Sequence, residues 1–169
     1  MAHKAGFVNI IGKPNVGKST LMNAMVGEKL SIITSKAQTT RHRIKGILNT
    51  PDYQIIFSDT PGILDPNYKL QEAMLKAARS ALVDADVLIY LTEVGENPDL
   101  ENPFIQKVAN AKVPVLLVIN KIDLSNQEEV ESHLEAWNQA LPKAEIIPIS
   151  ALRNFNVDFI FNRILEHLP

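Results

Sequence analysis

The chain has 169 residues, of which 46% are hydrophobic and 21% are charged, and its formal net charge is -2. This composition is typical of one soluble globular domain with a substantial core. The slight negative charge disfavours a surface built mainly for nucleic acid, because such domains usually carry a basic excess. The absence of cysteine excludes disulfides and thiolate metal sites. Without a signal peptide or a bilayer-length apolar segment, we expect a cytoplasmic protein, and peripheral membrane association stays open.

The first part of the chain predicts three strands and two helices. A β-rich run at Phe7–Ile11 is followed by a helix at Lys18–Val26. Ile44–Asn49 and Tyr53–Phe57 are β-rich runs separated by a Thr-Pro-Asp turn, which predicts a hairpin. Apolar residues at helical spacing from 70 to 82 then predict a second helix.

The rest of the chain alternates strands with helices. In chain order we predict a strand at Val87–Leu91, a helix at Pro103–Ala111, a strand at Val115–Ile119, a helix over Val130–Leu141, a strand at Ile146–Ile147 and a helix over Val157–Leu168. Trp137 lies in register with the apolar positions of its helix, so we expect it to be partly buried. The alternation predicts a three-layer α/β fold with a mostly parallel six-stranded sheet, one antiparallel hairpin and helices on both faces.

A phosphate-binding motif occupies the junction of the first strand and helix. Residues 12–19, GKPNVGKS, match the pattern G-x-x-x-x-G-K-[ST]. Its glycines let successive N–H groups point inward as an anion-binding nest, and the following helix adds its positive dipole end. Lys18 is expected to contact the β- and γ-phosphates, and Ser19 to ligate Mg²⁺. The predicted phosphate site comprises Gly12, Lys13, Pro14, Asn15, Val16, Gly17, Lys18, Ser19 and Thr20. The alternative, a chance match in an unrelated turn, is disfavoured by the strand-to-helix context.

A base-reading motif follows the strand at Val115–Ile119. It consists of Asn120, Lys121 and Asp123 in the run NKID. Ligands of parallel sheets bind at the carboxyl ends of strands, so these residues should face the same crevice as the phosphate loop. A carboxylate there can accept hydrogen bonds from N1–H and the exocyclic amine of guanine, whereas adenine would leave it unpaired. Alone the pattern often marks a polar turn, but its position favours a guanine site.

Two shorter signals complete the predicted site. Asp59, Thr60, Pro61 and Gly62 follow the third strand, where Asp59 could hold Mg²⁺ through water and Gly62 could bring a backbone N–H to the γ-phosphate. The alternative is a Pro-Gly turn with a solvated aspartate. Ser150 and Ala151, which follow the last strand, could present a backbone N–H to guanine O6.

Together and in order, GKPNVGKS, DTPG, NKID and ISA resemble the translation-factor-related branch of the P-loop GTPases across essentially the whole chain. KAQTTRHRI at 36–44 and KLQEAM at 69–74 make the chain similar to the GTPase domain of the Era family of bacterial ribosome-assembly proteins. The resemblance implies a P-loop GTPase fold, with the first switch within Ser31–Arg43. It also implies that Thr40, or with less support Thr39, ligates Mg²⁺ and contacts the γ-phosphate.

The resemblance further implies an Mg²⁺-dependent switch that binds GTP and GDP and acts on the small ribosomal subunit and its RNA. In that family a carboxy-terminal KH domain grips the RNA. Residues 1–169 match the GTP-binding domain alone and contain no GXXG loop in KH context, so we expect weak or absent RNA binding by this chain. Nothing suggests a large apolar association face, and we expect a monomer.

The predicted set of catalytic residues lacks a side chain that orients the attacking water. Ras-like enzymes carry a water-orienting glutamine after the DTPG motif, but this chain has Ile63 there. We therefore expect slow catalysis by Lys18, Mg²⁺, the phosphate-loop amides, Gly62 and an ordered Thr40. In related GTPases without the glutamine, the residue matching Asn15 helps to hold K⁺, which makes K⁺ a second candidate cofactor; alternatively, Asn15 stabilises the turn.

Three rival functions stay open at this stage. A P-loop ATPase would share the phosphate motif, but Asp123 disfavours it. A nucleotide-binding module without significant turnover fits the presence of Ile63. Another ribosome-related or tRNA-modification GTPase would carry the same four motifs, and only the segments at 36–44 and 69–74 argue against it.

Overall fold

The computed structural model describes residues 4–12, 17–26, 43–59, 79, 82, 85–98 and 103–168. Residues 79 and 82 are helical, and the rest of the helix predicted from 70 to 82 lies outside the described residues. None of the helices in these ranges is long and apolar enough to cross a membrane.

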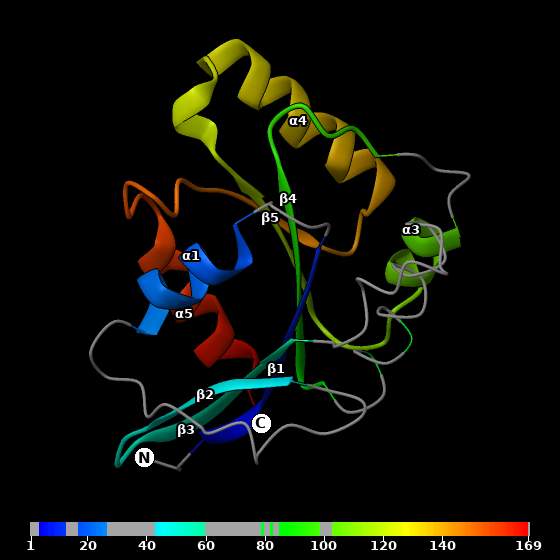
Figure 1. Ribbon diagram of the computed structural model, residues 1–169. Helices are drawn as coiled ribbons and strands as arrows, with labels where there is room; N and C mark the ends of the chain where they lie inside the picture. The colour runs from blue at the N-terminus through cyan, green and yellow to red at the C-terminus, as the bar shows by residue number, and fades with distance from the viewer. Residues whose placement is uncertain are drawn as a thin grey trace, which may run out of the picture.

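One six-stranded sheet forms the centre of the described structure (Figure 1). Its strands are β1 (Lys4–Gly12), β2 (Arg43–Asn49), β3 (Tyr53–Asp59), β4 (Val87–Glu93), β5 (Val115–Asn120) and β6 (Glu145–Pro148). They lie in the order β2-β3-β1-β4-β5-β6. Only β2 and β3 pair antiparallel, and every other neighbouring pair is parallel. The predicted fold class, including its single hairpin, is confirmed.

Helices cover both faces of this sheet. Helices α1 (Lys18–Val26) and α5 (Val157–His167) both pack on one face. The opposite face is covered by α3 (Pro103–Ala109) and α4 (Gln127–Ala140). A short 3-10 helix, η3 (Ile122–Leu124), follows β5 and was not predicted. The three-layer arrangement follows from strands whose side chains are buried on both faces.

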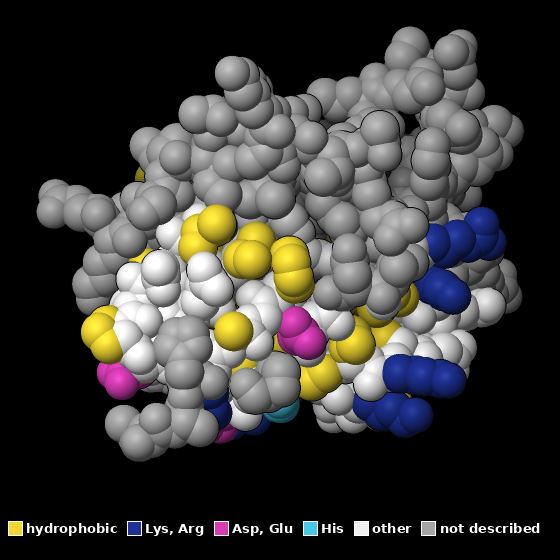
Figure 2. Space-filling view, turned by 90° about the horizontal axis from the view of Figure 1, so that it is seen from below, with side chains coloured by type: hydrophobic (Ala, Val, Ile, Leu, Met, Phe, Trp, Pro, Cys, Tyr) yellow, Lys and Arg dark blue, Asp and Glu magenta, His cyan; other side chains and the backbone are white. Residues whose placement is uncertain are grey.

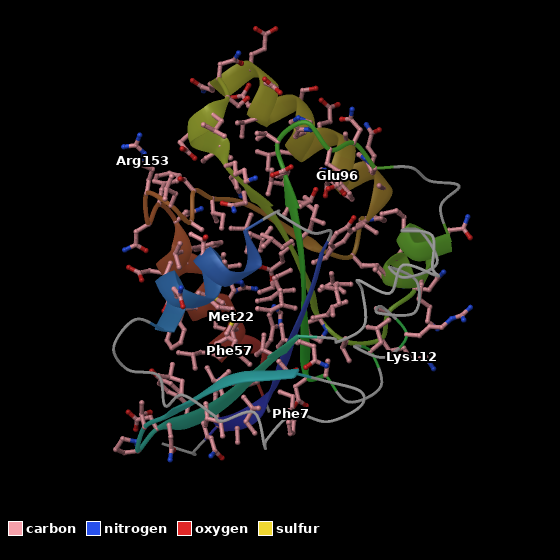
Figure 3. All side chains as sticks on the ribbon, in the orientation of Figure 1. Phe7, Met22, Phe57, Glu96, Lys112 and Arg153 are labelled. Atoms are coloured by element: carbon pink, nitrogen blue, oxygen red, sulfur yellow. The ribbon has the colours of Figure 1, made fainter. Side chains whose placement is uncertain are left out.

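The face under α1 and α5 is packed with apolar side chains. Because side chains alternate along a strand, Ile89 and Leu91 of β4 point to this face while Leu88 and Tyr90 point to the other. Figure 3 shows Met22 of α1 and Phe57 of β3 close together under the helix. Further buried contacts come from one stripe of α5, formed by Val157, Ile160 and Ile164. This stripe has the helical spacing that predicted α5.

The face under α4 corrects one prediction. Trp137 was expected to be partly buried, but it is 0% exposed. Its indole ring meets the Tyr90 ring edge-on, with centroids 5.5 Å apart, and its Nε1–H donates to the Glu96 carbonyl oxygen at 3.3 Å. The prediction underestimated burial because helical periodicity shows which side of α4 faces the sheet, not that the 94–98 loop supplies a partner for the indole N–H.

The surface at the amino-terminal ends of the parallel strands is partly apolar and partly basic. Hydrophobic side chains reach the surface in its middle, and Lys and Arg side chains gather on one flank (Figure 2). Phe7, which is 40% exposed, and Lys112 lie toward this end of the molecule (Figure 3). The phosphate and base motifs lie at the opposite edge, so this basic flank is separate from them.

Candidate guanine nucleotide site

The described parts of the phosphate motif lie where β1 ends and α1 begins, at the top of the sheet in Figure 1. Gly12 is the last residue of β1, and Lys18 is the first residue of α1. This confirms the predicted strand-to-helix context. Thr20 is an exposed residue of α1, whereas the side chains of Lys18 and Ser19 are outside the description. Lys13, Pro14, Asn15 and Val16 also lie outside the described residues.

Gly17 shows why the motif requires glycine before the lysine. Its backbone has φ 101°, a conformation that L side chains rarely adopt. A Cβ atom at this position would lie 2.4 Å from Nδ2 of Asn120. Gly17 also accepts the N–H of Leu21 at 2.9 Å, which starts the hydrogen bonding of α1. The phosphate loop and the base motif are therefore in direct contact at this point.

Asn120 connects that contact to the loop after β6. It is the last residue of β5 and is 3% exposed. Its side-chain Oδ1 accepts the backbone N–H of Ala151 at 3.0 Å. The Nδ2 atom of the same side chain lies near Gly17. One buried side chain thus joins residues from three distant parts of the sequence. Sequence reasoning placed Asn120 in the site, but not in this bridging role.

Asp123 lies in the first turn of η3, two residues beyond Lys121. Its Oδ1 accepts the hydroxyl of Ser150 at 2.8 Å, and its Oδ2 lies 4.0 Å from Nε of Arg153. Its side chain is 20% exposed, so the carboxylate is oriented by protein groups yet open to a ligand. Figure 3 shows Arg153 at the upper left of the molecule, on the loop that precedes α5. A carboxylate held in this way can accept two N–H groups of guanine.

The proposed donors to guanine O6 already have partners. The Ala151 N–H donates to Asn120, and the Ser150 N–H donates to the carbonyl oxygen of Phe155 at 3.2 Å. A contact of either N–H with guanine O6 therefore requires a shared, three-centre hydrogen bond. The remaining role of Ser150 is visible directly: its hydroxyl orients Asp123 and also accepts the N–H of Arg153 at 3.2 Å.

The candidate magnesium ligands are placed by their backbones alone. Asp59 is the last residue of β3 and pairs in register with Ile10 of β1. Ser19 is the second residue of α1, which follows β1. Both therefore lie at the carboxyl edge of neighbouring strands, and their oxygen ligands are of the kind that Mg²⁺ prefers. Thr40, Thr60, Pro61 and Gly62 lie outside the described residues. Within the described ranges, no group of three or more His, Cys, Asp or Glu residues could hold a metal ion.

Sequence reasoning missed Glu93. It is the last residue of β4, and its Oε2 lies 2.5 Å from Nζ of Lys121. The only available signal was its position at the end of an apolar strand, where parallel sheets bind ligands. A single glutamate at such a position is too common to be singled out from sequence.

The class of protein is shown by a family model. Residues 7–121 match the family described as 50S ribosome-binding GTPase. This stretch runs from β1 through Lys121 and includes the phosphate motif and the start of the base motif. The chain belongs to this GTPase family.

Within the family, the resemblance to Era is confirmed. The chain is 46% identical over 167 residues to GTPase Era of Clostridium botulinum (strain Kyoto / Type A2), covering 98% of this chain and 56% of that protein. GTPase Era of Clostridium acetobutylicum is also 46% identical, over 170 residues. The chain thus spans 56% of the length of these curated relatives.

Solved structures agree with this assignment. An Era variant from Aquifex aeolicus bound to GDP and AlF₄⁻ is 40% identical, with a TM-score of 0.73, and the match covers 98% of this chain and 57% of that one. Era in complex with MgGDPNP and a fragment of 16S ribosomal RNA is 40% identical, with a TM-score of 0.72 and coverage of 99% and 58%. The G domain of the Thermotoga maritima FeoB iron transporter, at 24% identity and a TM-score of 0.61, shares the fold.

Proposed function

We propose that this chain binds GTP and GDP with Mg²⁺, hydrolyses GTP slowly, and serves as the switch of an Era-type protein in small ribosomal subunit assembly. The observation that carries the proposal is the position of Asn120. Its side chain touches Gly17 of the phosphate motif and holds Ala151, while Ser150 beside Ala151 orients Asp123. Phosphate and base recognition are thereby brought to one edge of the sheet, as a nucleotide requires.

The residues assigned to catalysis are the phosphate-loop amides, Lys18, Gly62, and Thr40 with Ser19 and Asp59 around Mg²⁺. Bound Mg²⁺ would neutralise charge that develops on the phosphate oxygens. Lys18 and the loop amides supply further positive potential in a fixed geometry. Slow turnover follows from the presence of Ile63 where Ras-like enzymes carry glutamine. The Era complex with MgGDPNP and 16S ribosomal RNA supports the ligand and the assembly target.

The test is GTP turnover by the purified chain with Mg²⁺, measured beside Lys18→Ala and beside ATP. We expect slow hydrolysis of GTP, no comparable use of ATP, and a loss of about 100-fold or more in the variant. Tight GTP binding without turnover would instead support the nucleotide-binding module. Equal use of ATP would contradict the role given to Asp123.

Base selection can be tested separately from hydrolysis. Inosine nucleotides lack the exocyclic amine, so they should bind about 10- to 100-fold more weakly than guanosine nucleotides. Asp123→Ala should abolish this preference, because no carboxylate is left to accept the amine. If the variant still prefers GDP over IDP by the same ratio, Asp123 does not read the base.

A potassium requirement is the narrower part of the proposal. Asn15 matches the residue that helps to hold K⁺ in related GTPases without the glutamine, so K⁺ would act as a second cofactor. Turnover in KCl should then exceed turnover in NaCl at equal ionic strength. Equal rates would leave Asn15 with a role in the turn alone.

A further inference from the structure

An ion pair joins the ends of two central strands beside the base motif. Glu93 ends β4 and pairs in register with Asn120, which ends β5. The next residue, Lys121, directs its Nζ to within 2.5 Å of Glu93 Oε2. The two side chains are 33% and 35% exposed, so each is partly withdrawn from solvent. This partial burial distinguishes the pair from freely solvated surface charges, which contribute little.

Lys121 has an unusual backbone that its surroundings must maintain. Its φ of 65° and ψ of 30° are left-handed, a conformation that costs energy for residues other than glycine. The flanking peptide groups are held: the Val94 N–H donates to the Asn120 carbonyl at 3.1 Å, and the Ile122 N–H donates to the Ile149 carbonyl at 3.2 Å. The Lys121 side chain leaves this fixed backbone toward Glu93. Backbone and side chain are thus both specified by contacts.

The pair also lies on the side of the sheet that carries the phosphate motif. Residues opposite one another in a parallel ladder share a face, and Leu91 opposite Val118 faces α1 and α5. Two residues further along, Glu93 and Asn120 share that face, where Asn120 meets Gly17. Glu93 therefore holds the Lys121 ammonium beside the face on which Asn120 meets Gly17.

We propose that Glu93 is a positioning residue of the guanine site, which holds the Lys121 side chain in its binding conformation before nucleotide arrives. This inference rests on the proposed nucleotide binding. A lysine stem has many rotamers, and ordering them during binding opposes association. With Glu93 present, that ordering is complete in the free protein. Losing it weakens binding, and affinity differences among variants of one site appear mainly in the dissociation rate.

The experiment measures release of a fluorescent GDP analogue from the 169-residue chain. Glu93→Gln should accelerate release about tenfold. Glu93→Asp, which keeps the charge but is one methylene shorter, should lie between Gln and the native residue. Glu145→Gln is the matched control, because Glu145 is also 33% exposed and paired with Arg163, on an edge strand outside the site. It should change release less than twofold.

A double-mutant cycle separates positioning from general stabilisation. Lys121→Met removes the ammonium and keeps the stem, so Glu93→Gln added to it should change release less than twofold. The thermal unfolding temperature without nucleotide should fall by similar amounts in Glu93→Gln and Glu145→Gln. An unchanged release rate in Glu93→Gln, or an undiminished tenfold effect beside Lys121→Met, would overturn the proposal. If Glu93→Gln does not fold, Glu93→Asp supplies the same comparison. Failure of the native chain to bind GDP would instead refute the proposed function.

Discussion

The two faces of the sheet bury side chains of different chemistry. Toward α1 and α5, the buried strand residues are apolar as far as Leu91 of β4 and Val118 of β5. Toward α3 and α4, strand alternation places Asn9, Ser58 and Tyr90 among the buried residues. The first face is held by non-directional burial, whereas on the second a buried polar atom stabilises the fold only where it finds a hydrogen-bond partner.

The partners on the second face tie a loop to a helix. The Tyr90 hydroxyl donates to Glu96 Oε2 at 3.2 Å, and Glu96 also accepts the Trp137 indole N–H through its carbonyl oxygen. One residue earlier, the Gly95 N–H donates to Nε2 of His133 at 3.0 Å, which requires the tautomer with the proton on Nδ1. Buried polarity therefore positions the loop after β4, the strand that ends in Glu93.

The largest effect should come from removing Trp137. Trp137→Ala is expected to lower the free energy of unfolding by about 4 kcal/mol, through a large cavity and the loss of its ring contact. Ile160→Ala on the other face should cost about 3 kcal/mol. Urea unfolding of both variants measures the difference. Trp137→Phe, which keeps a ring against Tyr90, should recover more than half of the loss; no recovery would show that the indole N–H dominates.

A smaller but more specific effect is expected at Ser58. Its hydroxyl donates to Asn9 Oδ1, and both residues are buried. Ser58→Ala should lower the free energy of unfolding by about 2 kcal/mol, because a buried acceptor loses a donor. Ile55→Val, which removes one methylene from the apolar face, should cost about 1 kcal/mol. The comparison of the faces fails if removing the oxygen costs clearly less than removing the methylene.

Tyr90 makes the second face sensitive to alkaline pH. Burial, reinforced by the neighbouring charge of Glu96 and its hydrogen bond, raises the pKa of Tyr90 well above its ordinary value of 10.0. The unfolded chain therefore loses this proton above pH 10 while the folded chain keeps it, and stability falls as pH rises. Relative to Tyr90→Phe, the native chain should lose about 1 kcal/mol per pH unit above pH 10. If the free energies of unfolding in urea changed equally with pH in the native chain and in Tyr90→Phe, the raised pKa of Tyr90 would be contradicted.

The smallest effect should come from the edge of the sheet, outside both faces. Arg163 of α5 donates to both carboxylate oxygens of Glu145, and His167 Nε2 lies 2.9 Å from Glu145 Oε1. The hydrogen bonds from Arg163, aided by His167, hold the pKa of Glu145 below its ordinary value of 4.5. Because both side chains are partly exposed, Glu145→Gln should cost less than about 1 kcal/mol at pH 7.

A carboxylate with a lowered pKa stabilises the fold above its unfolded pKa, and that contribution is lost as pH falls through the folded value. The difference between native Glu145 and Glu145→Gln should therefore shrink below pH 4.5, and also in high salt. Thermal unfolding at pH 7 and pH 3, at low and high salt, measures both changes. A difference that grows toward pH 3 would reverse the sign of this argument.

The sequence by itself determined the fold class and predicted the residues of the nucleotide site. Apolar runs and helical spacing located the six strands and the helices α1, α3, α4 and α5 to within a few residues, because burial imposes those periods locally. The phosphate and base motifs could be recognised because phosphate binding needs glycine backbone and guanine recognition needs a carboxylate, whatever surrounds them. β6 was recognised from only two residues, Ile146–Ile147, yet it spans Glu145–Pro148.

Only the tertiary structure decided which of these pieces touch. The strand order, the contact of Asn120 with both Gly17 and Ala151, and the pairing of Glu93 with Lys121 join residues far apart in the chain. The complete burial of Trp137 likewise depends on a loop that no periodicity predicts. Hydrogen bonds and ion pairs depend on distances of a few ångströms between such segments, whereas sequence patterns report only each residue's preference for the interior or the surface.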